Sequence, residues 1–207
     1  MKEPERIKAQ YAAGAESWSG RQYADATAYL SHRAALLTSL GPALEPGDRI
    51  LDLACGDGAL ASFLPAFTYL GVDASPEMVD EARRHGVEAQ LGDLNDFAPA
   101  EPVAATCVFR AIYYARDRAA FFRHVAGYTE RKLVFDLNPR QYRLEDVRAD
   151  LRAAGFTGLE LRPFFVPQTV ALPRAAVAAL RAAERSGPAA RLALRYRFTY
   201  VCAAHCR

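Results

Sequence analysis

From residue 48 onward, short apolar runs alternate with segments in which apolar residues recur every three or four positions. The runs predict strands, and the helical spacing predicts helices between them. This alternation is typical of a parallel sheet with helices on both faces. The predicted strands are Ile50–Ala54, Thr68–Val72, Glu88–Leu91, Ala105–Phe109 and Lys132–Leu137, and the predicted helices are Ala59–Pro65, Pro76–His85, Arg116–Gly127 and Leu144–Ala154.

The two ends of the chain carry other patterns. Apolar spacing predicts helices at Arg6–Ala13 and Tyr23–Leu40, which would form an N-terminal helical cap over residues 1–45. Toward the other end, Thr157–Phe165 and Arg191–Ala203 predict two antiparallel strands, with a helix at Pro173–Arg185 between them. We therefore expect one domain, made of the cap, a core at 46–165, an insertion at 166–190 and a final strand at 191–207.

Acidic residues interrupt the apolar pattern at three successive strand ends. The first strand runs into the turn Asp52-Leu-Ala-Cys-Gly-Asp-Gly58, Asp73 ends the second, and Asp93 follows the third. Glycines let a backbone turn tightly and approach a ligand closely, and the amides at the next helix start face that ligand. Ligands of open α/β sheets bind at the carboxyl ends of the strands, so the sequence predicts a nucleotide-type ligand there.

In their order and spacing, these motifs resemble the class I S-adenosylmethionine-dependent methyltransferases. The resemblance spans residues 11–160, and Tyr11 and Trp18 look like its small-molecule, ubiquinone-biosynthesis-like branch. It implies a Rossmann-like three-layer α/β sandwich whose mostly parallel seven-stranded sheet has its last strand antiparallel. It also implies S-adenosyl-L-methionine as cofactor and S-adenosyl-L-homocysteine as product. The motifs that carry it are Asp52–Gly58, Gly71-Val-Asp-Ala-Ser75, Gly92-Asp-Leu94 and Leu151-Arg-Ala-Ala-Gly-Phe156.

The resemblance also implies roles for single residues. Asp52 and the Ala54–Gly58 backbone would hold the methionine part of the cofactor. Asp73 would accept hydrogen bonds from the ribose hydroxyls, and Asp93 from the adenine amino group. Each acid has a plainer reading as a helix cap, while Asp57 and Asp96 are expected to be solvated loop residues. Further cofactor contacts are expected from Cys55, Gly56, Gly58, Ala74, Leu94, Arg110, Tyr11 and Trp18.

Methyl transfer depends on alignment and exclusion of water more than on a strong acid. Aromatic faces stabilise the cationic methyl region, so Tyr113, Tyr114 and Tyr11 are the catalytic candidates, with Trp18 beside them. The sequence offers no convincing general base, and an acceptor that arrives as a neutral amine or has a low pKa needs none. The insertion is either a lid near the acceptor site or a helix that packs on the sheet edge.

The sequence argues against several other kinds of site. Gly56–Ala61 also fits the dinucleotide fingerprint G-x-G-x-x-A, but Asp57 would set a like charge beside a pyrophosphate, and 49 residues precede the first strand. Nucleic-acid amino-methylating enzymes carry their motif after the fourth strand, and catechol-type enzymes carry acidic metal ligands there. This chain has Arg110-Ala-Ile-Tyr113 at that place, which matches neither class. Cys202-Ala-Ala-His-Cys206 offers three ligands near a chain end, and we expect no metal site there.

Composition and charge narrow the choice of partner. The chain has 207 residues, 51% of them apolar, no apolar run of transmembrane length and no signal peptide, so we expect a cytoplasmic globular protein. The net charge of +2 divides into −5 over residues 1–139 and +7 over residues 140–207. The basic third either favours an anionic acceptor, an acidic partner or a lipid headgroup, or is merely a solvated surface.

We therefore expect methyl transfer to nitrogen, oxygen or carbon of a small-molecule acceptor, anionic or aromatic. The protein would act as a monomer or homodimer and bind no nucleic acid. Two alternatives stay open: a nucleic-acid or protein methyltransferase that uses the basic segment, and a non-catalytic S-adenosylmethionine-binding protein.

Overall fold

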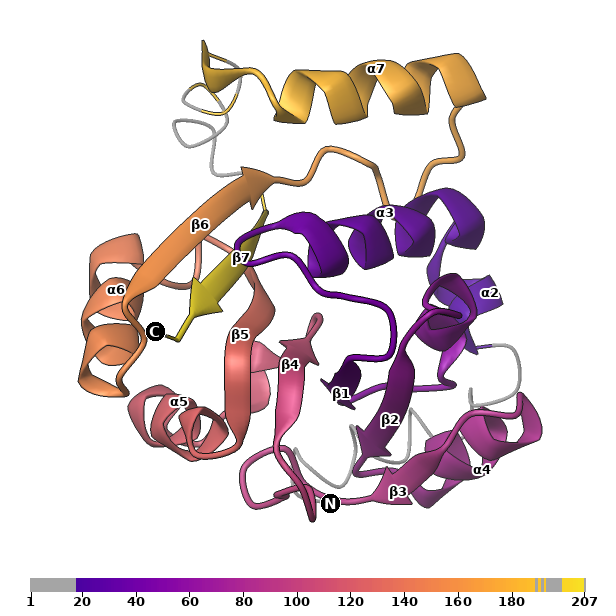
Figure 1. Ribbon diagram of the computed structural model, residues 1–207. Coiled ribbons are helices and arrows are strands. Elements are labelled where there is room, and N and C mark those ends of the chain that lie inside the picture. The colour runs from indigo at the N-terminus through magenta and orange to yellow at the C-terminus, as the bar shows by residue number, and fades with distance from the viewer. Residues whose placement is uncertain (1–17, 189, 191, 193–198, 207) are drawn as a thin grey trace, which may run out of the picture.

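The computed structural model describes residues 18–188, 190, 192 and 199–206. Their seven strands form one sheet in the order β3-β2-β1-β4-β5-β7-β6 (Figure 1). Neighbours among the first five strands pair in parallel, whereas β7 pairs antiparallel with both β5 and β6. The Rossmann-like sheet with an antiparallel last strand is thus confirmed. The strands are β1 (Arg49–Leu53), β2 (Thr68–Asp73), β3 (Ala89–Leu91), β4 (Val103–Val108), β5 (Thr129–Leu137), β6 (Gly158–Pro163) and β7 (Tyr200–His205).

Helices cover both faces of the sheet, which gives three layers. Successive side chains of a strand point to opposite faces, and β5 shows this clearly. Leu133 and Phe135 pack in the same buried cluster as Phe122 and Leu151 of α5 and α6, whereas Val134 packs in the cluster that holds α3. The α-helices are α2 (Trp18–Gln22), α3 (Ala26–Ser39), α4 (Pro76–Arg84), α5 (Arg118–Ala126), α6 (Leu144–Ala153) and α7 (Arg174–Glu184), and Ala59–Phe63 (η1) and Ile112–Tyr114 (η2) are 3-10 helices.

Helix α3 is fixed to the sheet by a buried lysine of β5. The Nζ of Lys132 donates to the carbonyl oxygens of Thr38 and Leu40, at 3.2 and 2.8 Å. The last carbonyls of a helix lack partners within it, so this lysine satisfies groups that would otherwise be buried unpaired. Burial lowers the pKa of Lys132 to about 8. The contact sets the position of α3, whose other end reaches the candidate site.

Two predicted elements differ clearly from the structure, and others lie outside the residues that it describes. Ala59–Pro65 is not an α-helix but the shorter η1, because it starts at Gly58 in a left-handed conformation and meets Pro65, which cannot continue a helix. The last strand ends at His205 and not at Ala203, because β5 and β6 pair with it on both sides. The predicted helix Arg6–Ala13 and most of residues 191–198 lie outside the described residues.

The helix of the insertion, α7, lies over α3 (Figure 1). Arg181 of α7 donates to the carbonyl oxygen of Ala28 at 2.7 Å, and the buried Glu184 pairs with His32. The beginning of the insertion approaches the strand ends, where Gln168 donates to the carbonyl oxygen of Gln22. Ala190 at its other end accepts from the hydroxyl of Tyr200, which pairs with Leu137 at the end of β5. The middle of the insertion therefore packs on α3, whereas both of its ends lie near the strand ends.

Candidate functional site

The turn after β1 combines three left-handed residues. Ala54, Gly56 and Gly58 have φ angles of 65°, 58° and 72°. This conformation costs a glycine nothing but strains an alanine. The turn also needs a glycine on the next strand, because a Cβ on Gly71 would lie 2.7 Å from the sulfur of Cys55. Trp18 lies beside Gly56, at 3.6 Å from the position a Cβ would take there, so the start of the cap meets the turn.

Asp52 is buried beneath this turn. The hydroxyl of Tyr69 donates to its Oδ2 at 2.5 Å. Burial raises the pKa of Asp52 to about 6, although the hydrogen bonds from Tyr69 and Cys107 favour the charged form. A buried carboxylate of this kind is stabilised by a nearby cation.

Asp73, at the end of β2, connects the two strand ends. Its Oδ2 accepts from the amide of Gly56 and its Oδ1 from the amide of Ser75, both at 2.9 Å. Burial raises the pKa of Asp73, and the backbone amides act in the opposite direction. Each carboxylate oxygen has a second lone pair, so Asp73 can still accept from a ligand hydroxyl. Ala74, which follows it, is partly exposed.

The expectation that Asp57 is solvated is wrong. Its side chain is buried and accepts from both the amide and the hydroxyl of Ser19, at 2.8 and 2.6 Å. Ser19 belongs to α2, so the cap supplies the partners that remove this carboxylate from solvent. Its negative charge stays within the glycine turn. Asp96 is largely exposed, as expected.

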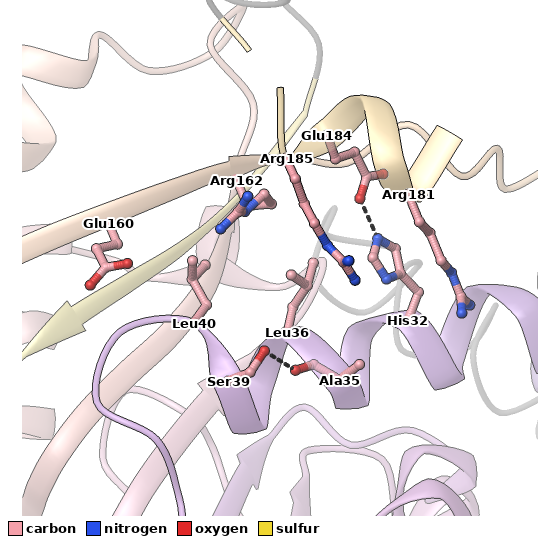
Figure 2. A pocket seen from close by; sticks show the side chains of 10 residues that line it. All are labelled: His32, Ala35, Leu36, Ser39, Leu40, Glu160, Arg162, Arg181, Glu184 and Arg185. Carbon is pink, nitrogen blue, oxygen red and sulfur yellow. Dashed lines mark hydrogen bonds and ion pairs between the residues drawn. The ribbon is translucent and has the colours of Figure 1, made fainter. Parts of the chain in front are cut away.

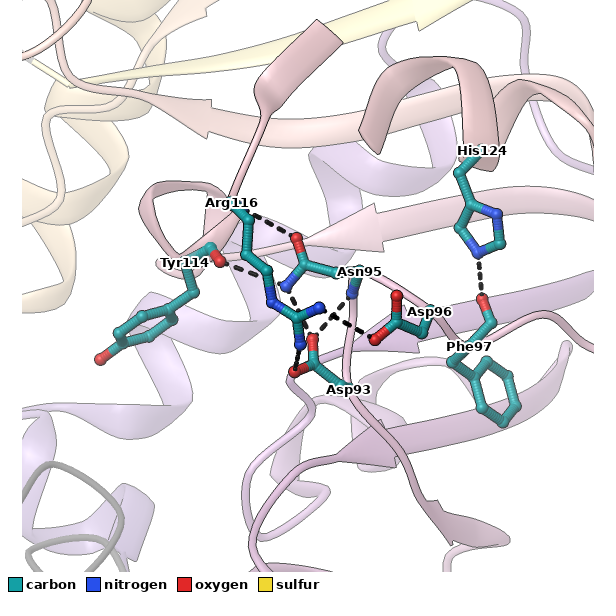
Figure 3. Close-up of polar contacts among 7 residues, drawn as sticks. All are labelled: Asp93, Asn95, Asp96, Phe97, Tyr114, Arg116 and His124. Atoms are coloured by element: carbon teal, nitrogen blue, oxygen red, sulfur yellow. Dashed lines mark hydrogen bonds and ion pairs between the residues drawn. The ribbon is translucent and has the colours of Figure 1, made fainter. Parts of the chain in front are cut away.

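Asp93 is already engaged within its own loop (Figure 3). Its Oδ1 accepts from the amide and the side chain of Asn95, and its Oδ2 from Arg116 at 2.7 Å. Partial burial would raise the pKa of Asp93, but the hydrogen bonds from Asn95 and the charge of Arg116 hold it below its ordinary value. An adenine role for Asp93 thus requires Arg116 to share this carboxylate. Leu94 is buried in the core.

The tyrosine pair after β4 is part of a short 3-10 helix. Tyr113 and Tyr114 lie in η2 with ring centroids 4.4 Å apart. Tyr113 is exposed, whereas Tyr114 packs against the core. Figure 3 shows the Tyr114 ring turned away from the Asp93 loop. Tyr11, the third catalytic candidate, lies outside the described residues.

A pocket of about 190 Å³ opens beyond β4 and β5, and we call it the strand-end pocket. Arg110 follows β4 with a left-handed φ of 56°, and its amide donates to the Oδ2 of Asp136 on β5 at 3.1 Å. A strained non-glycine residue held by a buried carboxylate is typical of functional sites. Neither Tyr113 nor Tyr114 is among the lining residues, which are Tyr29, Arg33, Arg110, Asp136, Phe164, Val166, Gln168 and Thr199.

A buried ion pair forms the floor of the strand-end pocket. The Nη2 of Arg33 donates to the Oδ2 of Asp136 at 2.6 Å and to the hydroxyl of Tyr29 at 2.8 Å. Burial would lower the pKa of Arg33, but Asp136 raises it above its ordinary value, so the guanidinium stays charged. Its Nε and Nη1 and the Oδ1 of Asp136 are buried without hydrogen-bond partners among the described residues. Such groups need a water or a ligand.

The sequence prediction missed most of this pocket. Arg33 stands among apolar positions of the predicted helix Tyr23–Leu40, and Asp136 interrupts the apolar strand Lys132–Leu137. A charge on a buried face was the available signal, but the pairing of residues 103 positions apart is visible only in the fold. Arg110 was predicted as a cofactor residue, and the structure sets it in the strand-end pocket.

Among the described residues, no helix is long and apolar enough to cross a membrane. In the same part of the chain, no group of three or more His, Cys, Asp or Glu side chains could hold a metal ion. Cys202 is buried within β7, and the thiol of Cys206 donates to the carbonyl oxygen of Thr129.

Comparison with known proteins points to one family. A family described as a methyltransferase domain matches residues 50–131, the stretch from β1 into β5. The trans-aconitate 2-methyltransferase of Mycobacterium tuberculosis (strain H37Ra) is 42% identical over 60 residues, which are 27% of this chain and 23% of that protein. The chain thus spans about a quarter of the length of this curated relative.

Solved structures share the fold at low identity. A chain of the complex between the Haloferax volcanii Trm112 methyltransferase activator and a putative methyltransferase has a TM-score of 0.67 at 20% identity, with 95% of this chain and 94% of that chain covered. The geranyl diphosphate C-methyltransferase of Streptomyces coelicolor A3(2), solved with Mg²⁺, geranyl diphosphate and S-adenosyl-L-homocysteine, has a TM-score of 0.61 at 16% identity, with 86% and 79% covered. The predicted likeness to the ubiquinone-biosynthesis-like branch stays a prediction.

Proposed function

We propose that this chain, a class I S-adenosylmethionine-dependent methyltransferase by its fold and its matched domain, methylates a small anionic acceptor in the strand-end pocket. The observation that carries the proposal is the position of two arginines. Arg33 and Arg110 line the pocket beyond β4 and β5, and these strands come next to β1, which leads into the glycine turn. The acceptor atom of such a molecule is a carboxylate or similar oxygen.

The turn after β1 fits the cofactor chemically. S-adenosylmethionine carries a sulfonium and an ammonium, and the residues at the turn include the buried carboxylates of Asp52 and Asp57. We assign the methionine part to Asp52 and the Ala54–Gly58 backbone, the ribose hydroxyls to Asp73, and the adenine to Ala74, Leu94 and Asp93. Trp18 would close the site from the cap, because it already packs on Gly56.

When bound, the cofactor supplies an electrophilic methyl group: an acceptor lone pair forms the new bond to carbon while the carbon–sulfur bond breaks and its electrons remain on sulfur as the neutral thioether. The protein residues orient the acceptor and exclude water. A carboxylate acceptor has no proton to lose at neutral pH, which agrees with a site that offers no evident general base.

Arg110 is the best candidate to hold the acceptor anion. Arg33 is already paired with Asp136, whereas Arg110 has no ion pair among the described residues and lies over the ring of Tyr23, at 5.9 Å from its centroid. Guanidinium groups bind carboxylates through two parallel hydrogen bonds. One relative is named for trans-aconitate, a tricarboxylate, and this name supports a carboxylate as the acceptor.

The test is formation of S-adenosyl-L-homocysteine with a panel of small di- and tricarboxylates and their neutral amides. We expect turnover with carboxylates only, and Arg110→Gln should reduce kcat/KM by roughly 10- to 100-fold, as for loss of a charged hydrogen bond. Arg143→Gln, which removes an exposed arginine from the start of α6, is the matched control. Turnover of the neutral amides, or full activity of Arg110→Gln, would contradict the proposal.

A further inference from the structure

A second cavity, of about 120 Å³, lies between α3, β6 and α7 (Figure 2). We call it the α7 cavity. It shares no lining residue with the strand-end pocket. Three arginines line it: Arg181 of α7, Arg185 directly after α7, and Arg162 of β6. The pair formed by His32 and Glu184 lines it too, as does Glu160.

Three of these polar side chains already have partners in the fold. One carboxylate oxygen of Glu184 pairs with His32, and the other accepts from the amide of Phe165 at 2.6 Å. Arg181 donates to the carbonyl oxygen of Ala28 and to the hydroxyl of Ser31, at 2.7 and 3.0 Å. These contacts attach α7 to α3. Glu184 and Arg181 thus already have partners within the protein.

Arg162 and Arg185 differ from the others. Neither has an ion pair within the part of the chain that the structure describes, and the Nε of Arg162 is buried without a hydrogen-bond partner. Figure 2 shows the guanidinium group of Arg185 between α7 and α3, and that of Arg162 beside β6 near Leu40. The exposed Glu160 lines the cavity from β6 but lies beyond ion-pair distance of both. Two like charges that share a partly enclosed space repel each other unless an anion lies between them.

We propose that the α7 cavity binds a small oxyanion of the phosphate type, held by Arg162 and Arg185. Paired guanidinium groups from different elements are suited to such an ion because each presents a planar fork of donors. The volume admits a tetrahedral ion or the terminal group of a phosphomonoester, but not a nucleotide. The ring of His32 stacks on that of Phe164, with the centroids 5.1 Å apart, and Phe164 lines the strand-end pocket. These two stacked rings would therefore lie between the ion and the acceptor.

Calorimetric titration with inorganic phosphate, at an ionic strength held constant with chloride, tests this proposal without cofactor or turnover. We expect saturable binding to the wild-type protein, and a loss of at least roughly tenfold in affinity for Arg162→Gln and for Arg185→Gln. Arg152→Gln, which removes an exposed arginine of α6, should bind as the wild type does. Glycerol 3-phosphate in a parallel titration distinguishes the sources: tighter binding of the ester indicates a phosphorylated metabolite, and equal binding indicates the free ion.

Arg110→Gln separates this cavity from the strand-end pocket. Phosphate binding that survives Arg110→Gln and is lost in Arg162→Gln supports the α7 cavity. Absence of saturable binding, equal binding in all variants, or loss in Arg110→Gln alone would overturn the proposal. Arg185 is exposed near the end of α7, so Arg185→Gln keeps the test decisive if Arg162→Gln fails to fold. A negative result here leaves the proposed methyl transfer standing, because phosphate binding is measured without turnover.

Discussion

The amide of Gly56 donates to the Oδ2 of Asp73 across 2.9 Å, which ties the glycine turn after β1 to the end of β2. The other oxygen of the same carboxylate holds the amide of Ser75, the N-cap of α4. One side chain thus fixes two backbone segments that would face the cofactor. Any ribose contact made by Asp73 therefore starts from an oriented carboxylate.

Asp73→Ala should weaken binding of S-adenosyl-L-homocysteine by about 2–4 kcal/mol, because a charged acceptor is lost. It should also lower the free energy of unfolding by about 1–3 kcal/mol, since the amides of Gly56 and Ser75 lose their acceptor. Calorimetry and urea unfolding measure the two effects separately. Asp80→Ala, at a largely exposed carboxylate of α4, is the control and should change neither. Unchanged cofactor affinity in Asp73→Ala would show that Asp73 is not the ribose ligand.

Asp52 should give the protein a distinctive pH dependence. Its pKa is raised by burial from 3.8 to about 6, so the ionised form is disfavoured in the folded state. The contribution of Asp52 to stability is therefore fully present below pH 3.8 and is lost as the pH rises through about 6. Relative to Asp52→Asn, the wild type should lose up to about 3 kcal/mol across that window. Urea unfolding of both proteins at several pH values measures this difference, and a difference independent of pH would refute the account of Asp52.

Ala54→Gly should stabilise the protein by up to about 1 kcal/mol, because Ala54 has a left-handed φ that glycine adopts without strain. The greater freedom of glycine in the unfolded chain opposes part of this gain. Ala149→Gly, at an exposed position in the middle of α6, is the matched control and should destabilise by about 0.5–1 kcal/mol. Thermal and urea unfolding of both variants provide the comparison. A loss of stability in Ala54→Gly as large as in the control would argue against strain at the turn.

Glu184→Ala should cost about 3 kcal/mol in stability, because the buried His32 and the amide of Phe165 both lose the carboxylate that they contact. Affinity for S-adenosyl-L-homocysteine should stay close to that of the wild type, because α7 packs on α3 and not on the glycine turn. Glu145→Ala, at an exposed carboxylate of α6, controls for the change of charge. If Glu184→Ala lost cofactor affinity but kept its stability, α7 would have a direct part in the cofactor site.

The sheet and the glycine turn could be predicted because their signals are local. Apolar runs mark the strands, and Gly56 and Gly58 do take the left-handed conformation that the motif requires. Asp57 was misjudged because its burial depends on Ser19, which lies 38 residues away. The floor of the strand-end pocket escaped prediction for the same reason, since Arg33 meets Asp136 only when α3 docks on β5. Local sequence reports backbone conformation well, whereas the pairing of buried charges depends on tertiary contacts.

Titration calorimetry with S-adenosyl-L-homocysteine and with NAD tests the central claim most directly. The buried acids Asp52 and Asp57 at the turn suit a cationic cofactor, and they oppose the pyrophosphate of a dinucleotide. We predict saturable binding of S-adenosyl-L-homocysteine and of S-adenosyl-L-methionine, one molecule per chain, with no heat of binding from NAD. Binding of NAD without a response to either sulfur compound would contradict the account.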